Sequence, residues 1–283
     1  MTPPLLSICI PTYNRREYLE TSLTEIAKQA SQFPEVEVIV SNNNSTDTTE
    51  LLVAGIWNKY PKIRYFRNDK NIGGERNHIR CLEEAKGEYA WLFGDDEILL
   101  PGGLAHVVES FRNKKWAYHI LLGNMRDSDK TEDDLYPSYK ELMRQRGAYA
   151  AIEYAFLSRW IFKRSLWDAG VAMETIATRF NHAYAIRKEG GVLVLNKPVI
   201  RVREQRAPLH DNTGAEHLWL NFNEYLKYLG VPLSGRIVFL WQHTVMGTVR
   251  RHLGRIRDKA IGKQEPEVPA PKSMKDYFEE LRK

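Results

Sequence analysis

The chain has 283 residues, of which 43% are hydrophobic, and it carries a formal net charge of +5. This length and composition suffice for a sizeable core in one large domain or two smaller ones. No apolar run approaches the roughly 18 residues of a membrane-spanning helix, and the first residues lack the basic region and cleavage site of a secretory signal peptide.

The two cysteines indicate the redox environment of the chain. Cys9 lies within an apolar run and Cys81 within a helical pattern, and neither belongs to a Cys-x-x-Cys pair. Isolated thiols in apolar surroundings are typical of proteins in a reducing cytosol, where disulfides are rare. We therefore expect a cytoplasmic protein.

Predicted strands alternate with predicted helices along the first hundred residues. Continuous apolar runs predict strands, and apolar residues repeated at helical spacing predict helices. Asn14 is expected to cap the first helix. The alternation predicts an α/β fold with a mostly parallel central sheet and crossover helices. The predicted strands are residues 5–10, 36–40, 63–66 and 89–94, and the predicted helices follow residues 14, 49 and 71.

A polar loop follows each of these strands, at residues 11–14, 41–47, 68–71 and 94–97. Because the carboxyl ends of parallel strands meet at the same edge of a sheet, all of these loops should gather there. Open α/β sheets bind their ligands at that edge. The sequence therefore predicts a binding site at this edge, although the loops alone do not name its reaction.

Three consecutive acids, Asp95, Asp96 and Glu97, stand in the last of these loops. Carboxylate oxygens suit a hard divalent cation such as Mg²⁺ or Mn²⁺, and such a cation in turn suits a diphosphate. The alternative is a solvated acidic turn that residues 101–103 (Pro-Gly-Gly) close. The triplet alone does not decide between a metal site and a solvated turn.

Beyond residue 110 the pattern is less regular. The polar and acidic residues 124–137 are predicted either to form a mobile loop over a substrate or to be a plain surface loop. The last two predicted strands should extend the sheet. The strands predicted here are residues 117–122, 159–162, 192–195 and 198–202, and residues 165–168 are predicted to open a helix.

The C-terminal residues are predicted to be helical and basic. From residue 244 to 260, apolar residues line one side of a predicted helix. A basic amphipathic helix can bind an anionic membrane surface. Alternatively, it packs on the rest of the protein and leaves its basic side in water. Its charge comes from Arg250, Arg251, Arg255, Arg257 and Lys259.

Four segments resemble a known family: residues 8–14, 40–47, 71–77 and 85–97, followed by Pro101. Their order and spacing are similar to those of the inverting, nucleotide-sugar-dependent glycosyltransferases of family 2, which have a GT-A fold. Within that family the chain most resembles transferases that build bacterial surface polysaccharides, including those that add dideoxyhexoses to O-antigen. The resemblance favours the metal site over the solvated turn.

The resemblance also implies domains and partners. Residues 1–212 would form the GT-A domain, with a nucleotide-sugar-binding half (1–110) and an acceptor half (111–212), and residues 213–283 would be a helical, basic C-terminal extension. The donor would be a nucleoside-diphosphate-sugar and the acceptor a glycan or lipid-linked glycan. The basic helix would then hold the enzyme peripherally on the inner face of the cytoplasmic membrane.

For the donor, the resemblance implies a pocket that departs from the family at one place. The family acid that contacts the nucleobase is replaced here by Asn42 and Asn43. Because an amide both donates and accepts hydrogen bonds, uracil, thymine and cytosine all stay open. Arg76 would lie near the base or the diphosphate, and Asp95 would reach the ribose. The implied donor-binding residues are Pro11, Thr12, Tyr13, Asn42, Asn43, Arg76 and Asp95.

For the cofactor, the resemblance implies a divalent cation, Mn²⁺ or Mg²⁺, bound by Asp96. Glu97 stands where the family often has a further acid, and His210 belongs to a segment that covers the metal in related enzymes. We therefore expect Glu97 and His210 as further metal ligands.

The catalytic base departs from the family pattern. Family members carry a Glu-Asp pair whose Asp takes the proton of the acceptor hydroxyl, and that pair falls here on Phe180 and Asn181. Neither side chain can act as a base. His182, beside Asn181, is one candidate because imidazole titrates near neutral pH. Glu174 is the other candidate.

Two other classes of function compete with an enzyme. The missing Glu-Asp pair leaves open a catalytically impaired nucleotide-sugar-binding protein. The basic tail suggests a nucleic-acid-binding protein, but the acids at the sheet edge would repel phosphate in the absence of a metal, so we expect no nucleic-acid partner.

Overall fold

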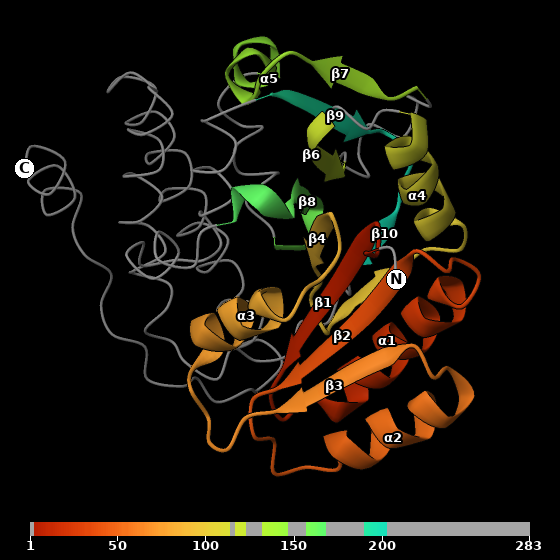
Figure 1. Cartoon of the computed structure of the whole chain (residues 1–283), viewed down its shortest axis with the longest axis vertical. Helices are drawn as coiled ribbons and strands as arrows, with labels where there is room; N and C mark the ends of the chain where they lie inside the picture. Colours follow the sequence, from red (N-terminus) through yellow and green to blue (C-terminus); the bar gives the residue numbers. More distant parts are fainter. Residues whose placement is uncertain (1–2, 114–116, 123–131, 147–156, 168–189, 203–283) are drawn as a thin grey trace, which may run out of the picture. The chain divides into compact units, whose positions relative to one another are not determined.

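The computed structural model of the chain describes residues 3–113, 117–122, 132–146, 157–167 and 190–202. The first half alternates between strands and helices as the sequence predicts. Figure 1 shows these elements in chain order. They are β1 (Leu6–Thr12), α1 (Arg16–Ala30), β2 (Val36–Asn42), α2 (Thr49–Lys59), β3 (Ile63–Arg67), α3 (Gly74–Glu83) and β4 (Tyr89–Leu92).

The second half adds shorter elements. Strands lie at the predicted residues 117–122 and close to the predicted residues 159–162 and 192–195. The elements are β5 (Glu97–Leu99), α4 (Gly103–Asn113), β6 (Ala117–Leu122), β7 (Asp134–Tyr136), α5 (Tyr139–Arg146), η1 (Leu157–Arg159), β8 (Trp160–Lys163), η2 (Arg164–Leu166), β9 (Gly191–Leu195) and β10 (Ile200–Val202).

An eight-stranded sheet organises the fold, in the order β3-β2-β1-β4-β8-β6-β9-β7. The strands β1 to β4 are parallel to one another, and β6 is parallel to β9. Strands β8 and β7 run antiparallel to their neighbours. The sheet is therefore mixed, with a parallel half that brings the ends of β1, β2, β3 and β4 to one edge, as predicted (Figure 1).

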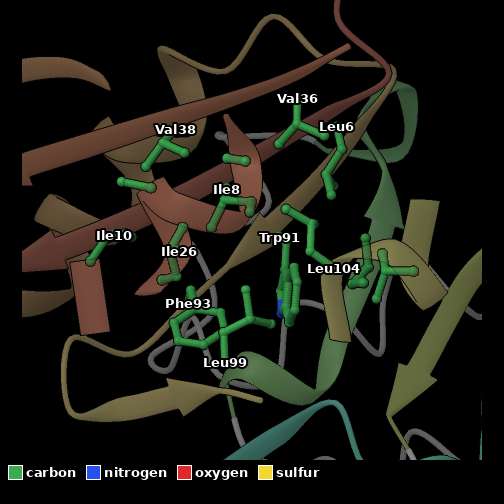
Figure 2. Packing of buried hydrophobic residues seen from close by; sticks show 14 of the residues in the cluster. Leu6, Ile8, Ile10, Ile26, Val36, Val38, Trp91, Phe93, Leu99 and Leu104 are labelled. Carbon is green, nitrogen blue, oxygen red and sulfur yellow. The ribbon is translucent and has the colours of Figure 1, made fainter. Parts of the chain in front are cut away.

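One face of the parallel strands packs against α1 and α4. Because successive side chains of a strand point to opposite faces, Leu6, Ile8 and Ile10 of β1 share this face, and all are fully buried. Figure 2 shows them beside Trp91 and with Ile26 of α1. Burying each large apolar side chain contributes roughly 1.5–3 kcal/mol, so this cluster holds the helices and the parallel strands together.

The opposite face packs against α3. Cys9 and Cys81 are both buried in this layer, beside Ala90 and Leu92 of β4. Burial raises the pKa of the Cys9 thiol well above its ordinary value. A thiol that stays protonated is unreactive, so Cys9 is a packing residue, in agreement with the sequence-based interpretation.

Gly87 lies beyond the end of α3 and has a packing role of its own. Helix α3 ends at Glu83, and Gly87 lies where the chain approaches β1. A Cβ atom on Gly87 would lie 2.7 Å from the backbone nitrogen of Ser7, closer than real Cβ atoms come. The Gly87 N–H donates to Ser7 Oγ over 2.7 Å. Glycine is therefore required here by a close backbone approach.

Asn14 does not cap α1, contrary to prediction. The N-cap position is Arg15, without a side-chain cap hydrogen bond, and Asn14 has a positive φ of 50°. The Asn14 Oδ1 instead accepts from the backbone N–H of Thr46, and its own N–H donates to Ser45 Oγ. The amide was predicted to act locally, but it ties together the loops that follow β1 and β2.

The last predicted strands do not both extend the main sheet. Strand β9 pairs with β6 inside it, whereas β10 pairs antiparallel with β5 in a separate two-stranded sheet. Residues 124–137 are also not all loop, because β7 pairs with β9 at residues 134–136. Strand pairing of this kind depends on distant partners, which local sequence does not specify.

The predicted C-terminal extension, with its boundary between residues 212 and 213, lies outside the described residues, and so does the basic helix. Within the described part of the chain, every helix is too short or too polar to cross a membrane.

Candidate active site

The loops that follow β1 and β4 meet at the carboxyl edge of the sheet. Strands β1 and β4 are parallel neighbours, with Cys9 opposite Leu92, so the residues after them are brought side by side (Figure 1). The Thr12 Oγ1 at the end of β1 donates to Asp95 Oδ2 over 2.8 Å. Two residues that are 83 positions apart in the sequence are thus joined by parallel pairing.

Arg15 connects both acids of this edge. Its Nη1 lies 3.1 Å from Asp95 Oδ1, and its Nη2 donates to Asp96 Oδ2 over 2.6 Å. Burial alone would lower the pKa of Arg15, but the two carboxylates raise it, and its pKa ends above the ordinary value. The guanidinium is therefore a permanent positive charge between Asp95 and Asp96.

Asp95 is an interior carboxyl. It is 4% exposed, and each of its oxygens has a partner, Thr12 for one and Arg15 for the other. Burial raises the pKa of Asp95 to about 6 from its ordinary 3.8, with a smaller contribution from Asp96, while Arg15 and Thr12 oppose the rise. The contact of Asp95 with a ribose stays a prediction. In this structure one of its oxygens accepts a hydrogen bond from Thr12 and the other pairs with Arg15.

Because the pKa of Asp95 is raised in the folded protein, the free energy of unfolding of the metal-free protein should fall as the pH rises. Between pH 3.8 and about 6 the folded protein holds a proton that the unfolded chain has released. The stabilising contribution is therefore fully present below pH 3.8 and is lost as the pH rises through about 6. Roughly two pKa units correspond to about 3 kcal/mol.

Urea unfolding in EDTA at pH 4 and pH 7 measures this effect when wild type is compared with Asp95→Asn. Carboxyls far from this site titrate alike in both proteins, so their contributions cancel in the difference. The free energy of unfolding of wild type, relative to the variant, should fall by roughly 2.4 kcal/mol between the two pH values, because a carboxyl of pKa 3.8 in the unfolded chain is already more than half ionised at pH 4. Parallel pH profiles would contradict an elevated pKa for Asp95.

Asp96 is the more accessible acid, with its side chain 27% exposed. Gly94 makes room for it, because a Cβ at residue 94 would lie 3.1 Å from Asp96 Oδ1. The Gly94 N–H donates to Ser158 Oγ over 2.8 Å, which fixes the turn. Asp96 is therefore placed where a ligand can reach its oxygens, as the sequence-based metal prediction requires.

The donor atoms around Asp96 fit a divalent cation that is shared with a substrate. The part of the chain that the structure describes holds no group of three or more His, Cys, Asp or Glu side chains arranged for a metal. Mg²⁺ and similar cations are nevertheless often bound by one or two carboxylates, with phosphate oxygens and water as the other ligands. Asp96 fits that kind of site, with the remaining ligands supplied by a diphosphate.

Glu97 stays near Asp96, because a Cβ at residue 94 would lie 3.1 Å from Asp96 Oδ1 and 3.5 Å from the Glu97 carboxyl carbon. It begins β5, where it is opposite Val202 of β10, and it is only 8% exposed. The three adjacent acids differ in their setting, since Glu97 belongs to a strand and the two aspartates lie in the turn before it. Its predicted role as a metal ligand stays a prediction.

The loop after β2 is held by an asparagine network. Asn42 is fully buried, its Nδ2 donates to Tyr65 Oη, and its Oδ1 accepts from the backbone N–H of Ser45. Both ends of this amide are therefore used inside the protein. The predicted contact of Asn42 with the nucleobase stays a prediction, and the placement favours a structural role.

Asn43 lies in the same network with a fixed amide orientation. Its Oδ1 accepts from the backbone N–H of Ile72 and from Asn68 Nδ2, both over 3.0 Å, and its Nδ2 donates to Asn71 Oδ1 over 2.8 Å. A backbone N–H requires an oxygen opposite it, so the oxygen of Asn43 must face Ile72. What this amide has left to offer a ligand is its second N–H.

The other predicted donor residues lie at or near this edge. Pro11 is buried in β1, and Tyr13 is half-buried directly after that strand. Arg76 is exposed in the first turn of α3. The structure thus joins Thr12 to Asp95 by a direct hydrogen bond and links Asp96 to Asp95 through Arg15. Asn181, His182, Glu174 and His210 lie outside the described residues.

Arg15 was missed by the sequence-based interpretation. The available signal was a basic residue directly after the loop that ends β1, one strand away from a run of acids. Its contacts depend on side-chain directions after a residue of positive φ, which spacing does not reveal. Asn68 and Asn71 were likewise seen as loop residues, whereas they orient Asn43.

The comparisons with known proteins agree with this geometry. Residues 7–169 match the family described as Glycosyl transferase family 2. Over 247 residues the chain is 30% identical to the abequosyltransferase RfbV of Salmonella typhimurium. The aligned region covers 79% of this chain and 74% of that relative. Over 122 residues it is 35% identical to the GalNAc(5)-diNAcBac-PP-undecaprenol beta-1,3-glucosyltransferase of Campylobacter jejuni, over 43% of this chain and 38% of that relative.

A solved structure shows the fold. The mannosyltransferase PcManGT of Pyrobaculum calidifontis, in complex with GDP-Man and Mn²⁺, superposes with a TM-score of 0.54 at 16% identity. The match covers 81% of this chain and 64% of that one, so the chain spans slightly less than two thirds of its length. The chain has the GT-A fold that the sequence predicts. Since the family match covers more than half of the chain and includes the loops after β1, β2 and β4, the chain belongs to glycosyl transferase family 2.

Proposed function

We propose that this glycosyltransferase moves a sugar from a nucleoside-diphosphate-sugar to a hydroxyl of a glycan, with inversion, and that Asp96 holds a divalent cation against the donor diphosphate. The observation that carries the proposal is the accessible Asp96 at the carboxyl edge of β1 and β4, fixed by Arg15 and beside the buried Asp95. Ligands of α/β sheets bind at this edge.

The chemistry of transfer explains why such a site needs these residues. When the bond between sugar and phosphate breaks, negative charge grows on the departing nucleoside diphosphate. A bound divalent cation would offset that charge and orient the diphosphate. Asp96 would hold the cation, and Arg15 adds a fixed positive charge nearby. Preorganised charges act strongly in a half-buried site because little solvent has to reorganise.

Inversion also needs a base on the side of the sugar ring opposite the diphosphate. That base would take the proton of the acceptor hydroxyl as the oxygen attacks the sugar. We assign this role to His182, with Glu174 as the other candidate.

The donor base is proposed to be read by Asn43 as a hydrogen-bond donor. Its amide oxygen accepts from Ile72 and Asn68, and one of its two N–H groups donates to Asn71. The second N–H is left to donate to an acceptor on the base. Ring nitrogen N3 is an acceptor in cytosine, whereas it carries a hydrogen in uracil and thymine. The carbonyl oxygens O2 and O4 of uracil and thymine can accept this N–H as well, so all three bases stay open, but the occupied Asn43 oxygen is not available to accept from the N3–H of uracil or thymine.

Asn43→Asp is expected to change the order of preference among CDP, UDP and dTDP. The substitution replaces a donor group by an acceptor, so the ratio of CDP to UDP affinity should fall by roughly tenfold or more. Calorimetric titration measures that ratio. Asn44→Asp is the matched control, because it changes the same charge one residue away on a partly exposed side chain that contacts Arg67. If Asn43→Asp leaves the ranking as in wild type, the base is read elsewhere.

The acceptor is proposed to be a lipid-linked glycan of a bacterial surface polysaccharide. The names of the two relatives support this, since one is an abequosyltransferase and the other acts on a glycan joined to undecaprenol through a diphosphate. A lipid-linked acceptor lies at a membrane, where the predicted basic helix at residues 244–260 would hold the enzyme.

A transfer assay tests the proposed function. Purified protein is incubated with Mn²⁺, a panel of UDP-, CDP-, dTDP- and GDP-sugars, and undecaprenyl-diphosphate-linked oligosaccharides. We expect release of one nucleoside diphosphate together with a one-sugar gain in acceptor mass. Binding of a nucleoside-diphosphate-sugar without any transfer or release would instead identify a catalytically impaired binding protein.

A further inference from the structure

Arg15 occupies Asp96 before any ligand arrives. Its Nη2 lies 2.6 Å from Asp96 Oδ2 while its Nη1 lies 3.1 Å from Asp95 Oδ1. The planar guanidinium has N–H groups in fixed directions, so it spans two carboxylates in a way that a lysine ammonium does not. Charge-assisted bonds of this length are strong. A cation that approaches Asp96 must therefore compete with Arg15.

Arg15 and a divalent cation cannot both bind this oxygen of Asp96 at low cost. Oxygen ligands lie about 2.1 Å from a cation such as Mg²⁺, so the cation would lie within roughly 5 Å of Nη2. Two positive centres at that distance repel one another, and a half-buried site screens them less than bulk water does. A cation that takes Oδ2 therefore displaces Arg15 from that oxygen, and a cation on Oδ1 would bind a carboxylate whose charge Arg15 already offsets.

Asp95, by contrast, is expected to keep Arg15. Its side chain is 5% exposed, and a buried carboxylate that loses its cationic partner is strongly disfavoured. Thr12 already satisfies its other oxygen over 2.8 Å. The contact between Nη1 and Asp95 can thus act as a fixed point about which the other nitrogen moves.

A diphosphate is the partner that suits the released nitrogen. The Nε of Arg15 is buried and has no acceptor within the described part of the chain, so the guanidinium has unused donor capacity. Its side chain is 26% exposed, so a ligand at this edge can reach it. Guanidinium groups bind phosphate oxygens through paired N–H groups. The guanidinium carbon also lies over the Tyr18 ring, 5.2 Å from its centroid, in a cation–π contact that stabilises the positive charge.

We infer that Arg15 is a donor-binding residue that exchanges partners: in the donor-free protein it neutralises Asp96, and in the donor complex its Nη2 contacts the diphosphate while Asp96 takes the divalent cation. Asp95 then serves as the positioning residue that anchors Arg15. The inference rests on the proposed function, because it needs a diphosphate and a cation at Asp96.

The exchange predicts opposite changes in two affinities when Arg15 is removed. In Arg15→Ala, Mn²⁺ should bind the nucleotide-free protein roughly tenfold more tightly, because the competing cation is gone. The same variant should bind CDP or UDP with Mn²⁺ roughly ten- to 100-fold more weakly, because a charged hydrogen bond to the diphosphate is lost. If Arg15→Ala only disrupted the structure of the site, the affinity for Mn²⁺ and the affinity for the nucleotide would both fall.

Electron paramagnetic resonance of free Mn²⁺ measures the first affinity, and calorimetry with CDP and with UDP measures the second. Arg15→Lys keeps the charge and guards against misfolding of the alanine variant, and it should show both changes at smaller size. Arg16→Ala is the matched control, since Arg16 pairs with Glu20 on the surface, and both of its affinities should equal those of wild type.

The outcomes separate this inference from the proposed function. If wild type binds neither CDP, UDP, dTDP nor GDP in the presence of Mn²⁺, the proposed function fails. If wild type binds a nucleoside diphosphate but Arg15→Ala and Arg15→Lys show no gain in Mn²⁺ affinity, or no loss in nucleotide affinity, the exchange of partners is overturned while the proposed function stands.

Discussion

Replacing Asp96 by asparagine is expected to lower the rate of sugar transfer by at least about 10²-fold, the scale on which enzymes lose a major stabiliser of transition-state charge. Asparagine has nearly the same shape as aspartate but no negative charge, so it binds a divalent cation weakly. Asp96 is also the acid whose side chain is partly exposed at the sheet edge, whereas Asp95 is interior. The measurement is kcat with saturating donor and Mn²⁺.

The control for Asp96→Asn removes a negative charge from the same kind of loop. Asp69 follows β3, as Asp96 follows β4, and it is exposed. Asp69→Asn should keep transfer within about twofold of wild type, because an exposed charge that does not hold the cation contributes little. Full activity of Asp96→Asn, or of wild type in EDTA, would remove the metal from the mechanism.

Replacing His182 by alanine is expected to reduce turnover by roughly 10²–10⁴-fold, the usual contribution of a positioned general base. His182 adjoins Asn181, which stands where the family's catalytic aspartate is expected. Imidazole accepts a proton near pH 7 and releases it to solvent after transfer. Donor affinity should change little, because the base acts on the acceptor.

The pH dependence of turnover adds a second readout for His182. In wild type the acidic limb of the pH–rate profile should fall in the histidine range, and it should vanish in His182→Ala. Glu174→Gln is the comparison, because Glu174 is the other candidate. Near-normal turnover in His182→Ala combined with a collapse in Glu174→Gln would transfer the role of base to Glu174.

The parallel half of the fold was predictable because its signals are local and long. Apolar runs marked β1, β2, β3 and β4, and the helices between them have apolar faces at regular spacing, so the edge at which their loops meet followed from topology alone. The pairing of β10 with β5 was not predictable, because both strands have only three residues and their pairing depends on contacts far apart in sequence.

The site was predictable in its residue types more than in its contacts. The sequence places Asp95 and Asp96 after a buried strand, but it does not reveal that one is interior and the other accessible. It does not reveal the direction of the Asn43 amide either, because that direction is set by the backbone of Ile72. Arg15 was missed for the same reason, since its role depends on two distant carboxylates.

The most direct test of the account is a thermal-shift comparison of wild type and Asp96→Asn with UDP, CDP, dTDP and GDP, each with Mn²⁺ and with EDTA. A ligand at about 100 times its Kd stabilises the folded state by roughly 2.7 kcal/mol, which is a readily measured rise in Tm. We expect at least one nucleoside diphosphate to raise the Tm of wild type in Mn²⁺, and we expect this rise to disappear in EDTA and in Asp96→Asn. No rise with any of them, or a rise that persists in both EDTA and Asp96→Asn, would contradict a metal-diphosphate site at Asp96.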